Sequence, residues 1–284
     1  MLTLHAPAKV NLVLEVLGKR EDGYHEIKSV MQTISLFDVL NFEEADGIEL
    51  DCSVSSLQTA DNLVLKAVNI LRQASGYRRG ARIKLKKRIP WGSGLGGGSS
   101  DAAITLIGLN KLWSLGLSYE QLAVIGAEVG SDVPFFIYGG RCLVRGRGDW
   151  VAPLPDIQTA CFVLLKPELP EQADKTKRLY NILKPSHYTA GDFAEQAVSA
   201  IDRESRLYGG TIFNVFDSVA FQAFPGLEKY WNSFLHAGVK NIHLAGSGPV
   251  LFTLVDNEVE ATAIQKKLSD CCINCCIVSS IKRE

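Results

Sequence analysis

The sequence predicts an α+β protein with two domains, residues 1–152 and 153–284. Three observations lead to this expectation. The 284 residues exceed the usual size of a domain built on one hydrophobic core. Strand-like alternation dominates the first third of the chain, and helical spacing follows it. After residue 155 the order is strand, helices, strand, strand, helix, strand, which is typical of a split βαβ, ferredoxin-like layer.

In the first domain, strands are expected where apolar and polar residues alternate, at residues 9–17, 26–36, 39–43, 48–54 and 81–88. Asp61 is expected to cap the helix that follows the fourth strand, and Gly76 is expected to end it. A largely apolar helix is expected over residues 101–113.

Ser118 and Gln121 have the spacing of a capping box, which predicts another helix running toward Val129. Residues 135–144 return to strand character. The Gly- and Pro-rich residues 146–155 are the expected boundary between the domains.

The second domain contains fewer strands and more helical patterns. Helices are expected between residues 174 and 237 and over residues 258–268. The expected strands are at residues 160–165, 241–244, 250–255 and 273–279.

Composition and charge are those of an ordinary globular protein. The 30 Lys and Arg nearly balance the 31 Asp and Glu, so the formal net charge is -1 and we expect neither a nucleic-acid partner nor a membrane partner. Lys9 and Glu15 interrupt what would have to be the apolar core of a signal peptide, and no stretch is long enough to span a bilayer. We therefore expect a cytoplasmic protein.

The 7 cysteines are odd in number and scattered, which favours reduced thiols over a disulfide framework. Cys271, Cys272, Cys275 and Cys276 suggest a metal site at first sight. A strand would turn Cys272 and Cys275 to opposite faces, and no histidine cluster accompanies them, so we expect no metal there.

The most informative segment is the glycine-rich run at residues 90–100. Five glycines fall within the seven positions 92–98, and a helix is expected to open at Ser99, Ser100 or Asp101. Backbone with so few Cβ atoms bends through positive φ and lets its N–H groups converge on an anion, and the positive end of a helix adds to that field. The run therefore predicts a phosphate cradle.

Three other interpretations of this run are less consistent with the residues around it. A dinucleotide-binding G-x-G-x-x-G loop would follow a buried parallel strand, whereas residues 81–88 carry five Lys and Arg, and Glu120 falls within a helical pattern. A Walker A loop would continue with Lys followed by Ser or Thr, which is missing here. A plain flexible loop would need neither the entry proline nor the immediate polar helix start.

Five shorter segments match a known family together with this loop. They are at residues 6–12, 20–25, 61–64, 130–135 and 244–248. Together they resemble the GHMP kinase superfamily over almost the whole chain. The resemblance implies a two-domain GHMP-kinase fold, with a ribosomal S5 domain 2-like α/β layer followed by a ferredoxin-like domain. It also implies ATP as co-substrate, Mg²⁺ brought with ATP, and a small-molecule substrate in the cleft between the domains.

Within the superfamily the chain most resembles the branch that phosphorylates the 2-hydroxyl of a cytidine diphosphate-linked methylerythritol, in isoprenoid precursor biosynthesis. The alternatives are a kinase for another small alcohol, of the homoserine or mevalonate type, and a non-catalytic nucleotide-binding regulator on the same fold. We expect a monomer or a weak homodimer.

The resemblance assigns three groups of residues. The catalytic pair is Lys9 and Asp132. ATP is bound by Pro90, Trp91, Gly92, Ser93, Gly94, Leu95, Gly96, Gly97, Gly98, Ser99 and Ser100, with Asn62 and Lys87 at the adenine end. The substrate is bound by Asn11, Tyr24, His25, Thr176, Tyr180, Gly246 and Ser247. Tyr24 and Tyr180 would stack on the cytosine, and Ser99 or Ser100 would be the residue nearest Mg²⁺.

Several of these residues have a structural alternative. Lys9 could be an exposed strand lysine, Asp132 a helix cap and Lys87 a solvated strand charge. The negative charge of Asp101 opposes phosphate binding unless it faces the metal or caps an amide. Pro249 has no N–H, so any amide contact from the second glycine loop must come from Ser247 or Gly248.

Overall fold

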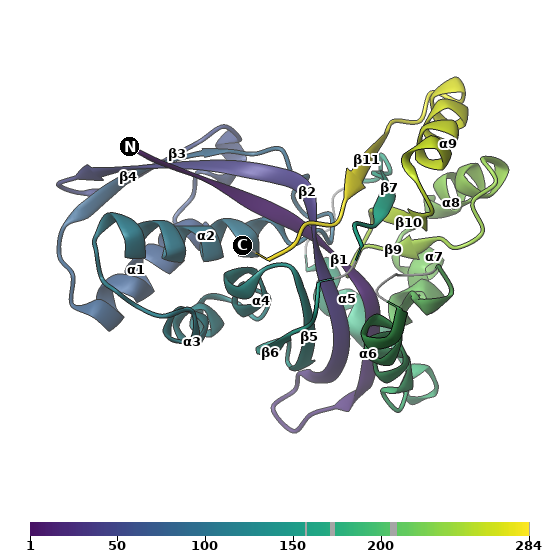
Figure 1. Ribbon diagram of the computed structural model, residues 1–284, viewed down its shortest axis with the longest axis horizontal. Helices are drawn as coiled ribbons and strands as arrows, with labels where there is room; N and C mark the ends of the chain where they lie inside the picture. Colours follow the sequence, from purple (N-terminus) through teal and green to yellow (C-terminus); the bar gives the residue numbers. More distant parts are fainter. Residues whose placement is uncertain (157, 171–173, 205–208, 284) are drawn as a thin grey trace.

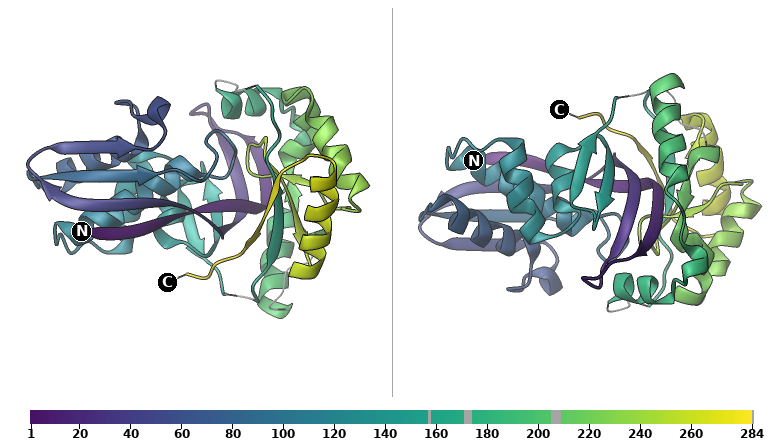
Figure 2. Two further views of the ribbon diagram at one scale, coloured as in Figure 1. Left: turned by 90° about the horizontal axis from the view of Figure 1, so that it is seen from above. Right: turned by 90° about the horizontal axis from the view of Figure 1, so that it is seen from below.

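The computed structural model describes residues 1–156, 158–170, 174–204 and 209–283 (Figure 1). The described residues form two sheets, each covered by helices. The larger sheet has the strand order β3-β4-β2-β1-β8, with β5 and β6 attached through β2. The smaller has the order β11-β7-β10-β9. In both views of Figure 2 the larger sheet extends from one end of the molecule to the middle, where it meets the smaller sheet. The expected α+β fold with a ferredoxin-like second part is thereby confirmed.

A long antiparallel hairpin runs through the larger sheet. β1 (Leu2–Lys19) and β2 (His25–Ala45) pair from Leu2 opposite Phe42 to Lys19 opposite His25, with three register shifts. The separation of the strands expected at residues 26–36 and 39–43 is therefore wrong, because β2 continues through Phe37 and Asp38 between them. Each register shift bends the hairpin. As a result one half of β2 pairs with β4 and the other half with β5.

The other strands of this sheet are short. They are β3 (Ile48–Cys52), β4 (Gly80–Lys86), β5 (Arg141–Gly146), β6 (Trp150–Pro153) and β8 (Phe213–Asn214).

Four helices lie against one side of the larger sheet (Figure 1): α1 (Leu63–Ser75), α2 (Gly97–Leu112), α3 (Tyr119–Val129) and α4 (Val133–Tyr138). The expected end of α1 at Gly76 is confirmed, since Gly76 takes the left-handed conformation that glycine tolerates. The expected cap Asp61 is wrong, because Asn62 accepts the N–H of Val64 instead. The capping box of Ser118 and Gln121 is present at the start of α3.

Two further expectations on these helices are wrong. α2 begins at Gly97, not at residues 99–101, because Gly96 with φ 75° redirects the backbone without a capping side chain. Residues 133–138 form α4 rather than the start of a strand. Periodicity cannot separate a short buried helix from a buried strand, and Pro134 in the first turn favours the helix.

The smaller sheet consists of β7 (Cys161–Leu165), β9 (His243–Leu244), β10 (Leu251–Val255) and β11 (Cys275–Ser279), all paired antiparallel. Five α-helices accompany it: α5 (Lys175–Ile182), α6 (Asp192–Glu204), α7 (Ala220–Ala223), α8 (Leu227–His236) and α9 (Glu258–Asp270). Four 3₁₀ turns complete the described elements: η1 (Ser55–Leu57), η2 (Pro185–His187), η3 (Gly209–Thr211) and η4 (Val215–Val219).

The two halves of the chain share a hydrophobic core. Val10 and Leu12 of β1 belong to one buried cluster with Phe162 of β7 and Phe252 of β10. β8 pairs with β1 in parallel, so the second half of the chain adds a strand to the first sheet. The buried cluster and the pairing of β1 with β8 hold the facing edges of the two sheets together, where the loops of both halves meet. The domain boundary expected between residues 152 and 153 stays a prediction.

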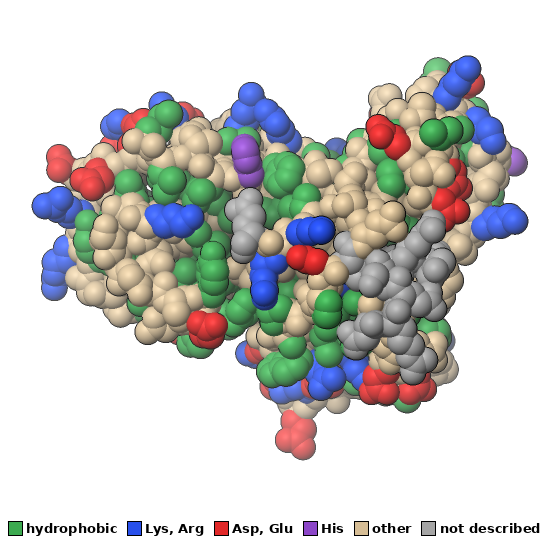
Figure 3. Space-filling model, viewed as in Figure 1, with side chains coloured by type: hydrophobic (Ala, Val, Ile, Leu, Met, Phe, Trp, Pro, Cys, Tyr) green, Lys and Arg blue, Asp and Glu red, His purple; other side chains and the backbone are tan. Residues whose placement is uncertain are grey.

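The structure also bears on the expectations about metal binding by the cysteines, membrane spans and surface charge. Cys271 and Cys272 lie in the turn after α9, and only Cys275 and Cys276 of the four belong to β11. Among the described residues no group of three His, Cys, Asp or Glu is arranged to hold a metal ion, and no helix is long and apolar enough to cross a bilayer. On the face in Figure 3, Lys and Arg are dispersed among Asp and Glu.

Candidate active site

A cavity of about 1480 Å³ opens where the two halves meet. Its walls come from β1, the turn between β1 and β2, the glycine run, the start of α4 and the start of α5. Of the residues assigned above from the resemblance, all but Leu95 and Ser100 line this cavity. Both exceptions are buried, with Leu95 and Ser100 exposed by 1% and 0%. The fold thus gathers positions that lie up to 238 residues apart, from Lys9 to Ser247.

The glycine run forms one wall of the cavity. Gly92, Gly94 and Gly96 all have positive φ, so the chain turns repeatedly before α2 begins. Gly94 touches the second glycine loop: a Cβ on Gly94 would stand 1.8 Å from the carbonyl oxygen of Ala245. The backbone N–H of Val250 also donates to the carbonyl of Ser93 at 3.3 Å. The two glycine loops are therefore packed backbone to backbone.

A buried charge cluster supports the glycine run from behind. Lys87 Nζ donates to Asp101 Oδ2 at 2.6 Å and also to Asp38 Oδ2, and all three side chains are almost fully buried. Asp38 Oδ1 in turn accepts the backbone N–H groups of Arg88 and Ile89. Lys87 is therefore no solvated strand charge. It lies beneath the entry to α2, near Gly97.

Burial and the two carboxylates act on this cluster in opposite ways. Burial lowers the pKa of Lys87, but the charges of Asp101 and Asp38 outweigh it and raise that pKa. Burial raises the pKa of Asp101 to about 8, against the attraction of Lys87. Among the described residues Asp101 accepts no backbone N–H, and it is one of the residues that line the cavity beside the glycine run. Its Oδ1 has no hydrogen-bond partner among the described residues.

Lys9 lies at the centre of the cavity. It is 4% exposed, so it is not the exposed strand lysine considered above. Its Nζ donates to Asn11 Oδ1 at 2.6 Å, and the amide of Asn11 donates to Ser29 Oγ at 2.8 Å. Burial lowers the pKa of Lys9, and the charge of Asp132 raises it in part. Its charge is therefore held close to a carboxylate in a partly dry environment.

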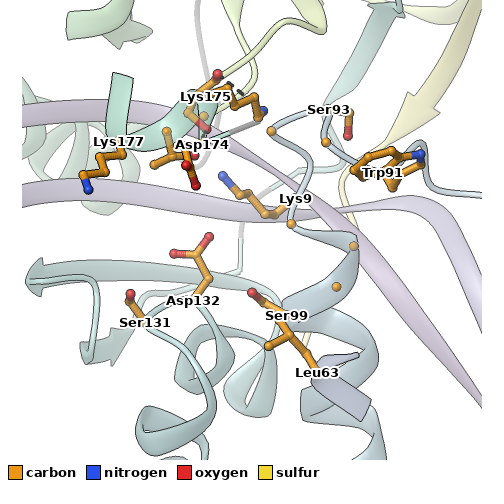
Figure 4. Close-up of a pocket in the computed structure, with 18 of the residues that line it drawn as sticks. Lys9, Leu63, Trp91, Ser93, Ser99, Ser131, Asp132, Asp174, Lys175 and Lys177 are labelled. Carbon is orange, nitrogen blue, oxygen red and sulfur yellow. Dashed lines mark hydrogen bonds between the residues drawn. The ribbon is translucent and has the colours of Figure 1, made fainter. Parts of the chain in front are cut away.

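Asp132 faces the same space from the start of α4. It stands at the N-cap position, yet its side chain makes no capping hydrogen bond, so the expected alternative of a helix cap does not hold. Figure 4 draws Lys9, Asp132 and Lys175 around one space, each from a different element. The charge of Asp132 also contributes to the raised pKa of Tyr180, after burial. The carboxylate is thus left open to a ligand.

The second glycine loop, residues 245–249, is a tight turn between β9 and β10. Ala245 and Val250 close it with a backbone hydrogen bond of 2.8 Å, and the N–H of Gly248 donates to the carbonyl of Ala245. Gly248 is therefore already bonded within the loop, which leaves the N–H of Ser247 for a ligand. The hydroxyl of Ser247 lies 2.9 Å from that of Thr176. This contact joins the loop to α5.

Aromatic side chains gather at the other end of the cavity. Tyr24 is 55% exposed, and the guanidinium of Arg147 lies over its ring, 5.2 Å from the centroid. The ring of His25 stacks on Tyr180 with a centroid separation of 4.7 Å. Burial, followed by the charge of Lys19, lowers the pKa of His25, so the neutral ring is favoured. Such a group offers flat faces to a planar ligand.

Two family models match the chain. The model described as "GHMP kinases N terminal domain" matches residues 62–140, and the one described as "GHMP kinases C terminal" matches residues 192–274. The chain belongs to the GHMP kinase family. The first match contains the glycine run and Asp132, and the second contains the second glycine loop.

Curated GHMP kinases resemble the chain over nearly its whole length. A protein of Dehalococcoides mccartyi named 4-diphosphocytidyl-2-C-methyl-D-erythritol kinase is 47% identical over 268 residues, which cover 94% of each chain. A protein of the same name from Thermodesulfovibrio yellowstonii is 38% identical over 92% of each chain.

Solved GHMP kinase structures share the fold. A crystal structure of 4-(cytidine 5'-diphospho)-2C-methyl-D-erythritol kinase superposes with a TM-score of 0.81 and 30% identity, and covers 98% of this chain and 99% of that one. Homoserine kinase from Cytophaga hutchinsonii superposes with a TM-score of 0.77 at 20% identity, with 99% and 94% covered. At that identity the second likeness concerns the fold alone.

The sequence did not point to several residues in and around the cavity of this GHMP kinase. Asp38 falls between the strands expected at residues 26–36 and 39–43, Arg147 falls in the segment treated as a domain boundary, and Lys175 opens α5. Asn214 donates to the carbonyls of Leu244 and Gly246 at 2.8 Å and so holds the second glycine loop. Only the fold reveals them, because each becomes relevant through a contact distant in sequence.

Proposed function

We propose that this GHMP kinase transfers the γ-phosphoryl group of ATP to the 2-hydroxyl of 4-diphosphocytidyl-2-C-methyl-D-erythritol, a step of non-mevalonate isoprenoid precursor biosynthesis. The observation that carries the proposal is the match of 36–47% identity, over nearly full length, to curated relatives of that name. The cavity supports it, because it combines an anion cradle, an open carboxylate beside a lysine, and an aromatic end.

The glycine run would hold the phosphates of ATP. Its bent backbone directs N–H groups at the cavity, and the first turn of α2 adds its unpaired amides and the positive end of its dipole. Asn62 and Lys87 line the same cavity and would border the adenine end. Leu95 and Ser100 would act from below the loop, by packing, since neither lines the cavity.

Asp132 and Lys9 would act on the phosphoryl transfer itself. The substrate hydroxyl oxygen forms a bond to the γ-phosphorus, the bond from that phosphorus to the bridging oxygen breaks, and ADP leaves. Asp132 orients the hydroxyl and accepts its proton as the new bond forms, which is worth about 10²- to 10⁴-fold in rate. Lys9 stabilises negative charge on the attacking oxygen and on the phosphoryl group.

The residues present fit Mg²⁺ brought with ATP. Ser99 lines the cavity beside the amides of the cradle, whereas Ser100 is buried with a hydroxyl that lacks a partner among the described residues. Of the two, Ser99 is therefore the residue that would approach the metal. When bound, Mg²⁺ supplies positive charge to the β- and γ-phosphate oxygens.

The aromatic end would receive the cytidine. Tyr24 and Tyr180 offer ring faces for stacking, which is worth about 1–3 kcal/mol per base. His25 lies against Tyr180 and would hydrogen-bond the base. Asn11, Thr176, Gly246 and Ser247 line the same cavity and would contact the polyol and the diphosphate.

A direct assay tests the proposal. The purified protein is incubated with Mg²⁺ and ATP and, separately, with the cytidine substrate, homoserine and mevalonate, and ADP release is followed. We expect turnover with the cytidine substrate alone. Turnover with homoserine or mevalonate instead would establish another alcohol kinase, and nucleotide binding without any turnover would establish a regulator. The cytoplasmic location, the lack of a nucleic-acid partner, and the monomer or weak homodimer stay predictions.

A further inference from the structure

Lys175 lines the cavity but has no role in the proposed function. It is the first residue of α5 and is partly buried. Its Nζ donates to the carbonyl oxygen of Gly248, and it lies 3.5 Å from the carbonyl oxygen of Ser247. Figure 4 shows it in the same region as Lys9. Two lysines from different halves of the protein thus border one space.

The charge of Lys175 is not balanced within the part of the protein that the structure describes. No carboxylate of the described residues forms an ion pair with it, and its hydrogen-bond partners are neutral carbonyls. Burial is the main cause that lowers its pKa to about 7, and the positive charge of Lys9 adds to this. A partly buried ammonium beside a like charge is unfavourable unless an anion joins it. The arrangement is therefore incomplete without a ligand.

We infer that Lys175 is a second anion-binding ammonium of this cavity, which binds phosphate oxygens together with Lys9. The inference rests on the proposed function for its ligand, because the two candidate sources are the γ-phosphate of ATP and the diphosphate of the cytidine substrate. The contact with Gly248 holds the ammonium at the second glycine loop until a ligand arrives. A second cation delivered from α5 would favour phosphate only when both halves of the cavity are in place.

The charged groups around Lys175 determine how it responds to pH. Lys9 approaches from β1, Asp132 lies at the start of α4, and Asp174 and Lys177 flank it on its own element, while the glycine loop offers only carbonyls. Below pH 7 the ammonium is already charged, so a phosphate ligand takes up no proton. Above pH 7 it is mostly neutral, so phosphate binding must draw in a proton.

Calorimetric titration at pH 6 and pH 8, in buffers of different protonation enthalpy, tests whether phosphate binding at Lys175 takes up a proton. One arm uses a non-hydrolysable ATP analogue with Mg²⁺, and the other uses the cytidine substrate alone. We expect proton uptake at pH 8 that is largely absent at pH 6, in the arm whose phosphate Lys175 binds. Lys175→Met should lose this uptake and weaken the same ligand about 10- to 100-fold. Lys175→Arg, which is always charged, should bind without uptake.

Lys184→Met is the matched control, because Lys184 is exposed just beyond the other end of α5 and should retain the uptake. Circular dichroism checks that each variant folds. Unchanged uptake and affinity in both Lys175 variants would overturn the inference. The proposed function fails separately: absent turnover with the cytidine substrate, alongside Lys175-dependent uptake with the ATP analogue, would remove the substrate assignment and leave the anion site standing.

Discussion

Gly94 and Ala245 touch through their backbones: a Cβ built on Gly94 would stand 1.8 Å from the carbonyl oxygen of Ala245 and 2.8 Å from the backbone nitrogen of Gly248. The first residue belongs to the glycine run and the other two to the second glycine loop. The contact therefore fixes the spacing between the phosphate cradle of one half and the loop that faces it from the other half.

Gly94→Ala should damage both stability and ligand binding. The added methyl group displaces the second loop, and φ of +87° adds strain for any L side chain. We expect a loss of about 2–4 kcal/mol in the free energy of unfolding by urea, together with weaker binding of an ATP analogue. Gly98→Ala is the matched stability control, since its nearest atom is Leu63 Cδ1 at 3.6 Å and alanine suits a helix. Equal stability of the two variants would contradict the packing described.

Asp132→Asn separates chemistry from binding. Asparagine keeps the shape of the side chain but accepts no proton, and it removes the negative charge near Lys9. We expect kcat to fall by at least about 10²-fold, with affinity for an ATP analogue nearly intact. Steady-state kinetics and equilibrium titration of the same preparation measure the two effects. Full turnover in this variant would remove Asp132 from the mechanism.

Asp101→Asn tests the buried cluster behind the glycine run. Burial raises the pKa of Asp101 from its ordinary value of 3.8 to about 8. Between these values the unfolded chain has lost a proton that the folded protein retains, so the free energy of unfolding falls as pH rises from about 4 to 8. The slope from this group is at most about 1.4 kcal/mol per pH unit.

Asparagine cannot titrate, so the stability of Asp101→Asn relative to the wild type should rise over the same pH range. Urea unfolding at pH 5, 6, 7 and 8 measures the difference, and it isolates the cluster of Asp101, Lys87 and Asp38 because the titrating groups outside this cluster are shared by the two proteins. A constant difference across this range would show that Asp101 keeps an ordinary pKa and that Lys87 compensates its burial fully.

Arg147 offers a test of the aromatic end. Its guanidinium covers one face of Tyr24 and is anchored to Asp149 at 3.0 Å, which leaves the other face for a base. Arg147→Gln should raise KM for the cytidine substrate about 2- to 5-fold, without changing KM for ATP. In a Tyr24→Leu background the same substitution should have no further effect. An equal effect in both backgrounds would mean that Arg147 acts independently of Tyr24.

The sequence by itself determined the α+β class, the four strands of the smaller sheet in their order along the chain, the glycine cradle and the family. These follow from local information: alternation, capping boxes and glycine spacing act over a few residues, and a contiguous motif can be recognised without its surroundings. Where the local signal was ambiguous it misled, as at α4, because the periodicity of its short buried apolar run does not separate a helix from a strand.

Only the tertiary structure decided how the charges of the cavity are balanced. In the folded protein Lys87 pairs with Asp38 and Asp101, and the carboxylate of Asp132 makes no capping hydrogen bond to α4. Lys175 lies near Lys9 and has no carboxylate partner among the described residues. The energy of a charge depends on its burial and on neighbours distant in sequence, so no local pattern encodes it.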